Sequence, residues 1–197
     1  MKIIVVGLKG SGKTTVLKKI SEKRPDIKIL NAGDYFEKVF KKHGLGRDTG
    51  QLGISKEDYI KFHQEIFQEM SNEIKKHKHV IVDTHLFIHK PEGYYPGLPI
   101  FALSSINPDT IVILDYPAED ILKRRKKDEK QIGRKRVAED NIKGVKREQE
   151  VQEHYGFVAS GVIGCTLKII KRDKKEKYPF EHAELNAEEI LKLFDKK

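Results

Sequence analysis

Residues 7–14, GLKGSGKT, have the composition and spacing of a loop that binds phosphate. They fit the pattern G-x-x-x-x-G-K-[ST] at every specified position, and they stand between an apolar run and a helical pattern. Glycines let backbone N–H groups turn toward an anion, and the positive end of the following helix adds to that attraction. A plain strand-to-helix turn is the alternative, and this context argues against it. The segment therefore predicts a nucleotide-binding loop of Gly7, Gly10, Ser11, Gly12, Lys13, Thr14 and Thr15.

Such a loop binds the phosphates of a nucleoside triphosphate together with Mg²⁺. We expect Lys13 to reach the β- and γ-phosphates and the Thr14 hydroxyl to bind the metal ion. A carboxylate is needed on the metal side, and two apolar runs end in aspartate, at Asp83 and Asp115. Either aspartate could simply cap the chain that follows, and for Asp115, just before Pro117, we favour that interpretation. Asp83 is the preferred metal-side acid.

A strongly basic segment, residues 123–136, holds nine Lys and Arg side chains against one Asp and one Glu. Phosphoryl transfer depends on positive charge around the transferring group, and the planar guanidinium donates to two phosphate oxygens at once. The catalytic candidates beside Lys13 are therefore Arg124, Arg125, Arg134 and Arg136. A solvated helix face is the alternative, and it holds for most of the lysines here.

The composition narrows the class of protein. The chain of 197 residues suits one globular domain, and no apolar stretch is long enough to span a membrane. Cys165 is the only cysteine, so an intrachain disulfide and a site of several thiolates are excluded, and a cytoplasmic location is expected. The formal net charge of +9 fits either a nucleic-acid partner or a surface rich in ion pairs.

The elements that would position these residues alternate along the chain. Short β-rich runs are read at 2–6, 27–31, 79–82, 110–114 and 166–170, and most are apolar throughout, as in buried parallel strands. Helical patterns are read at 13–23, 34–42, 55–77, 137–155 and 187–196, with a further helix opening at Pro117. The pattern predicts an α/β doubly wound parallel sheet. Residues 90–99, rich in Pro and Gly, are read as a loop at the ligand-binding edge.

Three further segments resemble one known family. They are Asp83-Thr84-His85, then residues 91–99 (PEGYYPGLP), then Asn107-Pro108. This order and spacing is similar to that of the archaeal adenylate kinases, which are nucleoside monophosphate kinases. Residues 31–34, Arg47-Asp48, Arg124 and residues 164–168 also resemble landmarks of that family, so the likeness spans nearly the whole chain.

The resemblance implies a single P-loop kinase domain over residues 1–197, with a five-stranded core. It implies an acceptor-binding side at about 31–75 and a lid at about 124–140. It also implies a cytoplasmic homotrimer that uses ATP with Mg²⁺, and it favours Asp83 as the strand-end acid. The residues that it places beside the acceptor are Gly33, Asp34, Arg47, Thr84, His85 and Lys90. A buried histidine satisfied by backbone is an equal alternative for His85.

The chain departs from the family pattern at two places on the acceptor side. Residues 49–53 read TGQLG where the family commonly has Met-Arg-Lys-Leu, and Lys90 stands one place after the usual basic residue. In the lid, a short insertion is needed to bring Arg134 and Arg136 into register. The first prediction is transfer of the ATP γ-phosphoryl group to AMP, and a kinase for CMP, UMP or a deoxynucleotide is the alternative. A P-loop ATPase that binds RNA or a ribosomal partner ranks below both, because no platform of interleaved aromatic and basic residues is evident.

Overall fold

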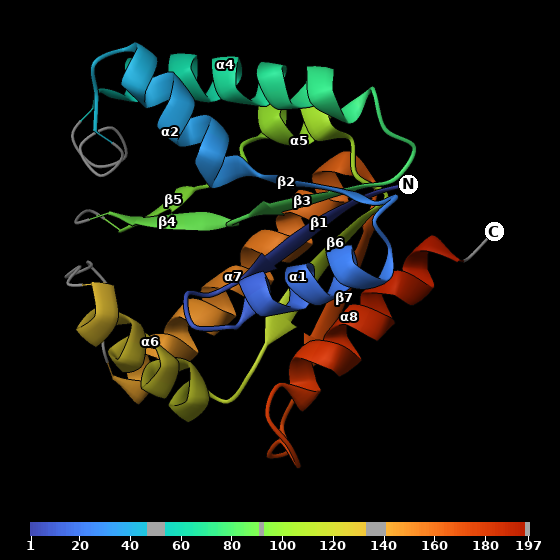
Figure 1. Cartoon of the computed structure of the whole chain (residues 1–197). Coiled ribbons are helices and arrows are strands. Elements are labelled where there is room, and N and C mark those ends of the chain that lie inside the picture. The colour runs from blue at the N-terminus through green and yellow to red at the C-terminus, as the bar shows by residue number, and fades with distance from the viewer. Residues whose placement is uncertain (47–53, 91–92, 133–140, 196–197) are drawn as a thin grey trace.

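A parallel sheet forms the centre of the computed structural model (Figure 1), which describes residues 1–46, 54–90, 93–132 and 141–195. Its five strands are β1 (Lys2–Gly7), β2 (Lys28–Asn31), β3 (Val80–Thr84), β6 (Thr110–Asp115) and β7 (Thr166–Lys171). They lie in the order β2-β3-β1-β6-β7, and every neighbouring pair is parallel. The strand order reverses at β1, so the carboxyl end of β1 lies at the point where such sheets bind ligands. The predicted doubly wound α/β fold is confirmed.

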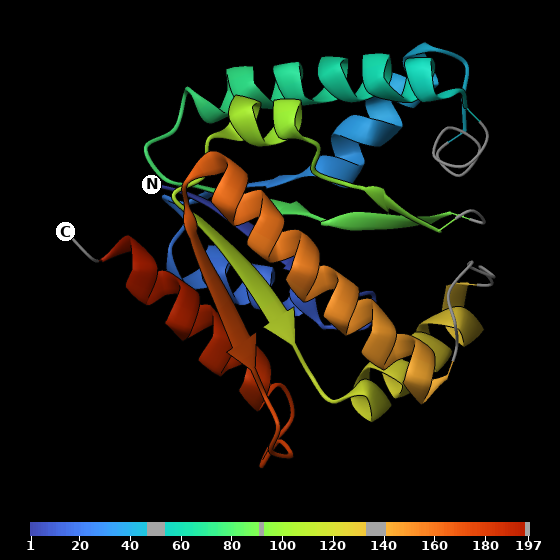
Figure 2. The ribbon, with the colours of Figure 1, turned by 180° about the vertical axis from the view of Figure 1, so that it is seen from behind.

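Helices connect the strands and cover both faces of the sheet (Figures 1 and 2). They are α1 (Lys13–Lys23), α2 (Ala32–Lys42), α4 (Lys56–Ile74), α5 (Ile100–Ile106), α6 (Ala118–Ile132), α7 (Ile142–Ile163) and α8 (Glu181–Phe194). The Ser55 side chain accepts from the Asp58 N–H, with acidic residues in the first turn of α4, as a stable helix start requires. The last two helices differ from the prediction, since α7 continues to Ile163 and α8 begins at Glu181. None of the described helices is long and apolar enough to cross a membrane.

The core lies on both faces of the sheet because the strands alternate their side chains. On β1, Ile4 and Val6 pack in the cluster that includes α2, α4, α5 and α7, whereas Ile3 and Val5 pack with α1 and α8. All four side chains are fully buried. Burial on both faces explains why the strands read as continuous apolar runs.

The segment predicted as a loop at 90–99 is partly a β-hairpin, so that prediction is wrong there. Strands β4 (Phe87–Lys90) and β5 (Gly93–Pro96) pair antiparallel, and α5 follows directly. The reason is aromatic packing, which the Pro and Gly content concealed. Phe87 meets Tyr94 edge to face at 5.1 Å, the Tyr155 hydroxyl donates to the Tyr94 carbonyl, and the Tyr59 hydroxyl donates to the Pro96 carbonyl. The hairpin is thereby held between α4 and α7.

Candidate phosphoryl-transfer site

The glycine loop links β1 to α1, as the sequence predicts. Gly10 and Gly12 have φ angles of +86° and +73°, which L side chains rarely adopt. Between them, Ser11 is buried and its N–H donates to the Leu8 carbonyl at 2.9 Å. Helix α1 begins at Lys13, directly after Gly12, which is its N-cap. The loop therefore sits at the positive end of α1, where an anion is stabilised.

Lys13 and Asp83 face each other across the ends of β1 and β3. The strand register pairs Val5 with Asp83, and the Lys13 Nζ forms an ion pair with the Asp83 Oδ1. Both side chains are largely buried, at 12% and 8% exposed. The Asn31 Nδ2 donates to the Asp83 Oδ2 at 3.3 Å. The Asp83 carboxylate of β3 thus contacts both the start of α1 and the end of β2 at the switch point of the sheet.

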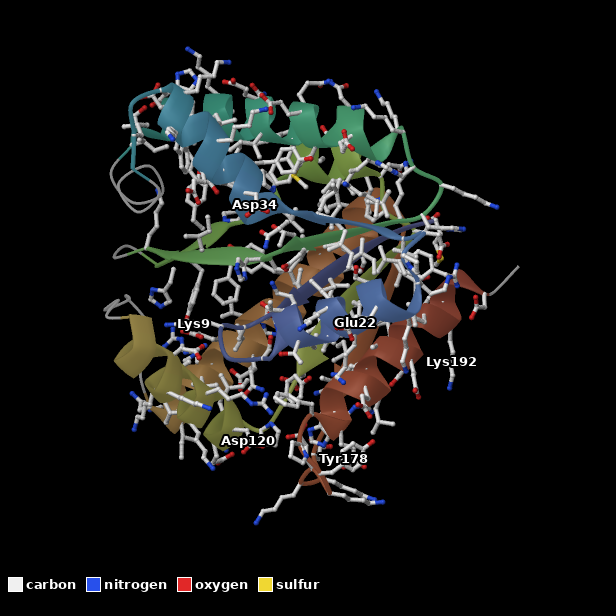
Figure 3. The ribbon with its side chains drawn as sticks, in the orientation of Figure 1. Lys9, Glu22, Asp34, Asp120, Tyr178 and Lys192 are labelled. Carbon is white, nitrogen blue, oxygen red and sulfur yellow. The ribbon has the colours of Figure 1, made fainter. Side chains whose placement is uncertain are left out.

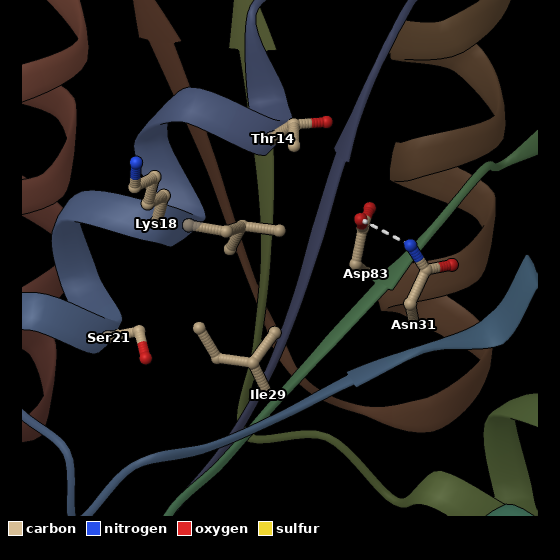
Figure 4. A pocket seen from close by; sticks show the side chains of 7 residues that line it. Thr14, Lys18, Ser21, Ile29, Asn31 and Asp83 are labelled. Atoms are coloured by element: carbon tan, nitrogen blue, oxygen red, sulfur yellow. Dashed lines mark hydrogen bonds between the residues drawn. The ribbon is translucent and has the colours of Figure 1, made fainter. Parts of the chain in front are cut away.

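A pocket of about 310 Å³ opens beside this pair (Figure 4). It is lined by Thr14, Leu17, Lys18, Ser21, Ile29, Asn31 and Asp83. The Thr14 hydroxyl and the Asp83 carboxylate lie at the same end of it (Figure 4). These are the hard oxygen ligands that Mg²⁺ prefers, so the residues fit the ion. In the described ranges no group of three or more His, Cys, Asp or Glu side chains could hold a metal.

Asp115, the other strand-end aspartate, lies at the end of β6 on the opposite side of β1. It accepts a hydrogen bond from the Gln149 Nε2 of α7, and its Oδ2 lies 3.9 Å from the Lys171 Nζ. Burial raises the pKa of Asp115. The carboxylate thus braces β6 against α7 and β7. Its contacts lie away from Lys13, which supports the choice of Asp83.

The start of α2 lies beside the same strand ends. The Asn31 Oδ1 accepts from the Gly33 N–H at 2.8 Å, so Asn31 bonds both Asp83 and the first turn of α2. Asp34 belongs to that first turn and is labelled in Figure 3. Thr84 ends β3 and is buried, whereas His85 is exposed, which contradicts the alternative of a buried histidine. The structure therefore brings Gly33, Asp34 and Thr84 to the edge that holds Lys13.

Lys90, the last residue of β4, lies against aromatic rings on the α4 side of the hairpin. Its Nζ is 5.2 Å from the Tyr59 ring centroid and 4.8 Å from that of Tyr95. His63 stacks on Tyr59 at 3.7 Å between centroids and is fully buried. Burial, with a smaller contribution from the Lys90 charge, lowers the pKa of His63 to about 3. The Lys90 ammonium is thus held by cation–π contacts.

The two described arginines of the predicted set both contact the glycine loop. The Arg124 Nη1 donates to the Gly10 carbonyl at 3.3 Å, and its guanidinium carbon lies 4.9 Å from the Tyr116 ring centroid. The Arg125 Nε donates to the Lys9 carbonyl at 2.9 Å. Figure 3 shows Lys9 on the loop, next to α6. The other predicted arginines, Arg47, Arg134 and Arg136, lie outside the described residues.

Three residues of this site carry no distinctive signal in the sequence. Asn31 bridges Asp83 and α2, Tyr116 lies under Arg124, and Glu148 of α7 accepts from the Arg125 Nη2 at 2.6 Å. Asn31 falls in a segment that resembles a family landmark, but its type alone assigns it no role. Glu148 is 23 positions from its partner, and only the packing of α6 on α7 brings the two together.

The names of this chain's relatives agree with a site for phosphoryl transfer. A family model described as "AAA domain" matches residues 6–146. The adenylate kinase of Pyrobaculum aerophilum is 39% identical, with 98% of this chain and 96% of the relative covered. The adenylate kinase of Thermoplasma acidophilum is 34% identical, with 88% and 91% covered, and that of Methanococcus vannielii is 33% identical, with 86% and 88% covered.

Two solved structures with the same fold are shikimate kinases. Shikimate kinase from Acinetobacter baumannii, in complex with shikimate, matches with a TM-score of 0.57 at 18% identity, with 98% of this chain and 92% of that chain covered. Shikimate kinase from Aquifex aeolicus matches with a TM-score of 0.50 at 20% identity, with 99% and 96% covered. At these identities the likeness concerns the fold alone. The relatives in sequence show more than the fold: this chain is a member of the adenylate kinase family.

Proposed function

We propose that this protein transfers the γ-phosphoryl group of ATP to AMP and so produces two molecules of ADP. The observation that carries the proposal is the arrangement around Asp83. This carboxylate pairs with Lys13 of the glycine loop and, through Asn31, is joined to the start of α2. A donor-binding loop and a second helix start therefore meet at one edge of the sheet. The names of the archaeal relatives support AMP as the acceptor.

The reaction needs charge neutralisation and alignment more than covalent chemistry. A phosphate oxygen of AMP forms the new bond to the γ-phosphorus while the bond to the β–γ bridging oxygen breaks. The leaving group is ADP, and no protein group has to take up or supply a proton. Lys13 supplies positive charge at the β- and γ-phosphates, and the helix start at Lys13 adds its own.

The remaining side chains of the site would hold metal, donor and acceptor. Thr14 and Asp83 are the residues that would hold Mg²⁺, which on binding ATP would shield the phosphate charge. Arg124, which donates to the Gly10 carbonyl, is the described lid arginine that we propose to contact the donor phosphates. Gly33, Asp34, Thr84, His85 and Lys90 remain the proposed acceptor-side set. Arg47, Arg134 and Arg136 are proposed from the resemblance alone.

The proposal treats residues 1–197 as one kinase domain with two specialised regions. The acceptor side at about 31–75 includes α2 and α4, and the lid at about 124–140 begins on α6. The rest of the lid, residues 133–140, lies outside the described part of the chain. We also assign the protein to the cytoplasm as a homotrimer, as the family resemblance implies. The single cysteine is consistent with a reducing compartment.

A substrate panel tests this function. ADP production is followed in a coupled assay with Mg-ATP and, in turn, AMP, CMP, UMP, GMP and the deoxynucleotides. We expect turnover with AMP, and loss of turnover when EDTA removes the metal and its return when Mg²⁺ is restored. Turnover confined to another monophosphate would contradict AMP and direct attention to residues 49–53. Slow ATP hydrolysis with no dependence on any acceptor would contradict the kinase and favour the RNA-binding ATPase.

A further inference from the structure

The most deeply buried charged side chain in the described part of the molecule is Arg125, which is 2% exposed. It belongs to α6 and reaches two partners with different nitrogens. Its Nε donates to the Lys9 carbonyl at 2.9 Å, and its Nη2 donates to the Glu148 Oε2 at 2.6 Å. Glu148, on α7, is 5% exposed. One guanidinium therefore connects the glycine loop, α6 and α7.

The glycine loop is packed tightly against the same part of α6. A Cβ on Gly10 would lie 2.7 Å from the Ile121 carbonyl oxygen and 3.3 Å from the Arg125 Cγ. The neighbouring Arg124 donates to the Gly10 carbonyl. Two successive carbonyls of the loop are thus held by two successive arginines. In a trans peptide the N–H points opposite to the carbonyl, so holding the Lys9 carbonyl turns the Gly10 N–H away from α6.

The arrangement does not suit a side chain kept for stability alone. A buried ion pair recovers little more than the cost of removing its charges from water, and apolar residues often replace it without loss. Within the described residues, the Arg125 Nη1 is buried and has no hydrogen-bond partner, which adds to that cost. The feature that apolar residues could not supply is the bond to the Lys9 carbonyl.

We propose that Arg125 and Glu148 are positioning residues for ATP, and that they act through the Lys9 carbonyl of the glycine loop without touching phosphate. Glu148 holds the guanidinium in place, and the guanidinium holds the loop. A lysine cannot reproduce this, because a single ammonium lacks the planar fork that serves both partners. The inference deepens the proposed function, on which its kinase context rests, but it concerns ATP binding alone.

The test is a double-mutant cycle on ATP affinity, measured by titration calorimetry without any acceptor. The variants are Arg125→Met, Glu148→Leu and the double variant, with Glu148→Gln as the conservative change. We expect each single variant to raise the Kd for ATP by about tenfold, and the double variant to be no weaker than either. Glu189→Gln removes the partner of Arg172 at a distant Arg–Glu pair and is the matched control. It should leave the Kd unchanged.

A direct phosphate contact predicts a different pattern. Arg125→Met alone would then weaken ATP binding, and both Glu148 variants would leave the Kd unchanged or lower it by freeing the guanidinium. That result would overturn the proposal. If a melting curve shows that a single variant fails to fold, the Kd for ATP of the double variant, which carries neither charge, still tests the proposal. Wild-type affinity in a folded double variant would also refute the role. Because no acceptor is present, these outcomes do not depend on whether AMP is the substrate.

Discussion

At the scale of single residues, the proposed site depends on the Lys13 ammonium, for which the Asp83 carboxylate and a nucleotide phosphate would compete. Lys13 pairs with Asp83, and the same ammonium is the group that we propose to bind the phosphates of ATP. The pair is largely buried, so the attraction between the two charges is screened less than on the surface. The Asn31 side chain gives Asp83 a second partner that does not depend on Lys13.

Lys13→Met is therefore expected to reduce kcat/KM for ATP by a factor of several hundred, since loss of one such donor costs ~3–4 kcal/mol of transition-state stabilisation. Steady-state kinetics with AMP as acceptor measures the change. Lys23→Met, at the exposed end of the same helix, is the control and should behave as wild type. Normal turnover in Lys13→Met would rule out the proposed mechanism.

At the scale of elements, the acceptor-side helices are joined to the hairpin by aromatic packing. Phe36 of α2 meets His63 of α4 at 4.6 Å, His63 stacks on Tyr59, and Tyr59 meets Tyr95 of β5 at 4.4 Å. His63 is the one titratable ring in this contact that charges between neutral and acid pH. Burial and the Lys90 charge hold its pKa at about 3, well below the ordinary 6.5.

This predicts a pH-dependent loss of stability. Between pH 6.5 and pH 3 the unfolded chain binds a proton on His63 that the folded chain does not, so the free energy of unfolding falls as the pH falls. The contribution is at most about 1.4 kcal/mol per pH unit. His63→Leu should remove it, and urea unfolding at pH 7 and pH 4.5 measures the difference. The exposed His154 provides the control His154→Gln. Equal pH dependence in wild type and His63→Leu would show that His63 does not contribute.

At the scale of the whole molecule, one face of α7 is apolar and exposed. Phe157, Val158 and Val162 are 61%, 65% and 52% exposed, although the opposite face of the helix packs on the sheet and α5. Contiguous exposed apolar side chains mark contact surfaces more often than isolated ones do. The family resemblance implies a homotrimer, and this face of α7 is the surface that we assign to it.

Phe157→Lys is expected to convert the proposed trimer to monomer, because a buried lysine at an apolar contact has no partner for its charge. Light scattering after size-exclusion chromatography gives the mass directly. Leu185→Lys, at an exposed apolar position on α8, should leave the mass unchanged. A wild-type protein that is monomeric at every concentration would contradict the trimer. A trimer that survives in Phe157→Lys would move the interface elsewhere.

The sequence by itself determined the features that depend on a few adjacent residues. The glycine loop, the start of α1 and the five apolar strands follow from glycine content, helix signals and periodicity, which act within one turn or one strand. Two aspartates end apolar runs, and the resemblance of residues 83–85 to a family motif singled out Asp83 from Asp115.

Tertiary structure alone decided the contacts between distant segments. It set Lys13 against Asp83, buried Arg125 between Lys9 and Glu148, and paired β4 with β5 in a hairpin held by Tyr59 and Tyr155. The physical reason is that the type of a side chain limits what it can bind, whereas the burial and orientation of that side chain depend on which helices pack together. From the sequence, an arginine in a basic segment is predicted to bind phosphate. Only the packing of α7 beside α6 shows that Arg125 pairs with Glu148.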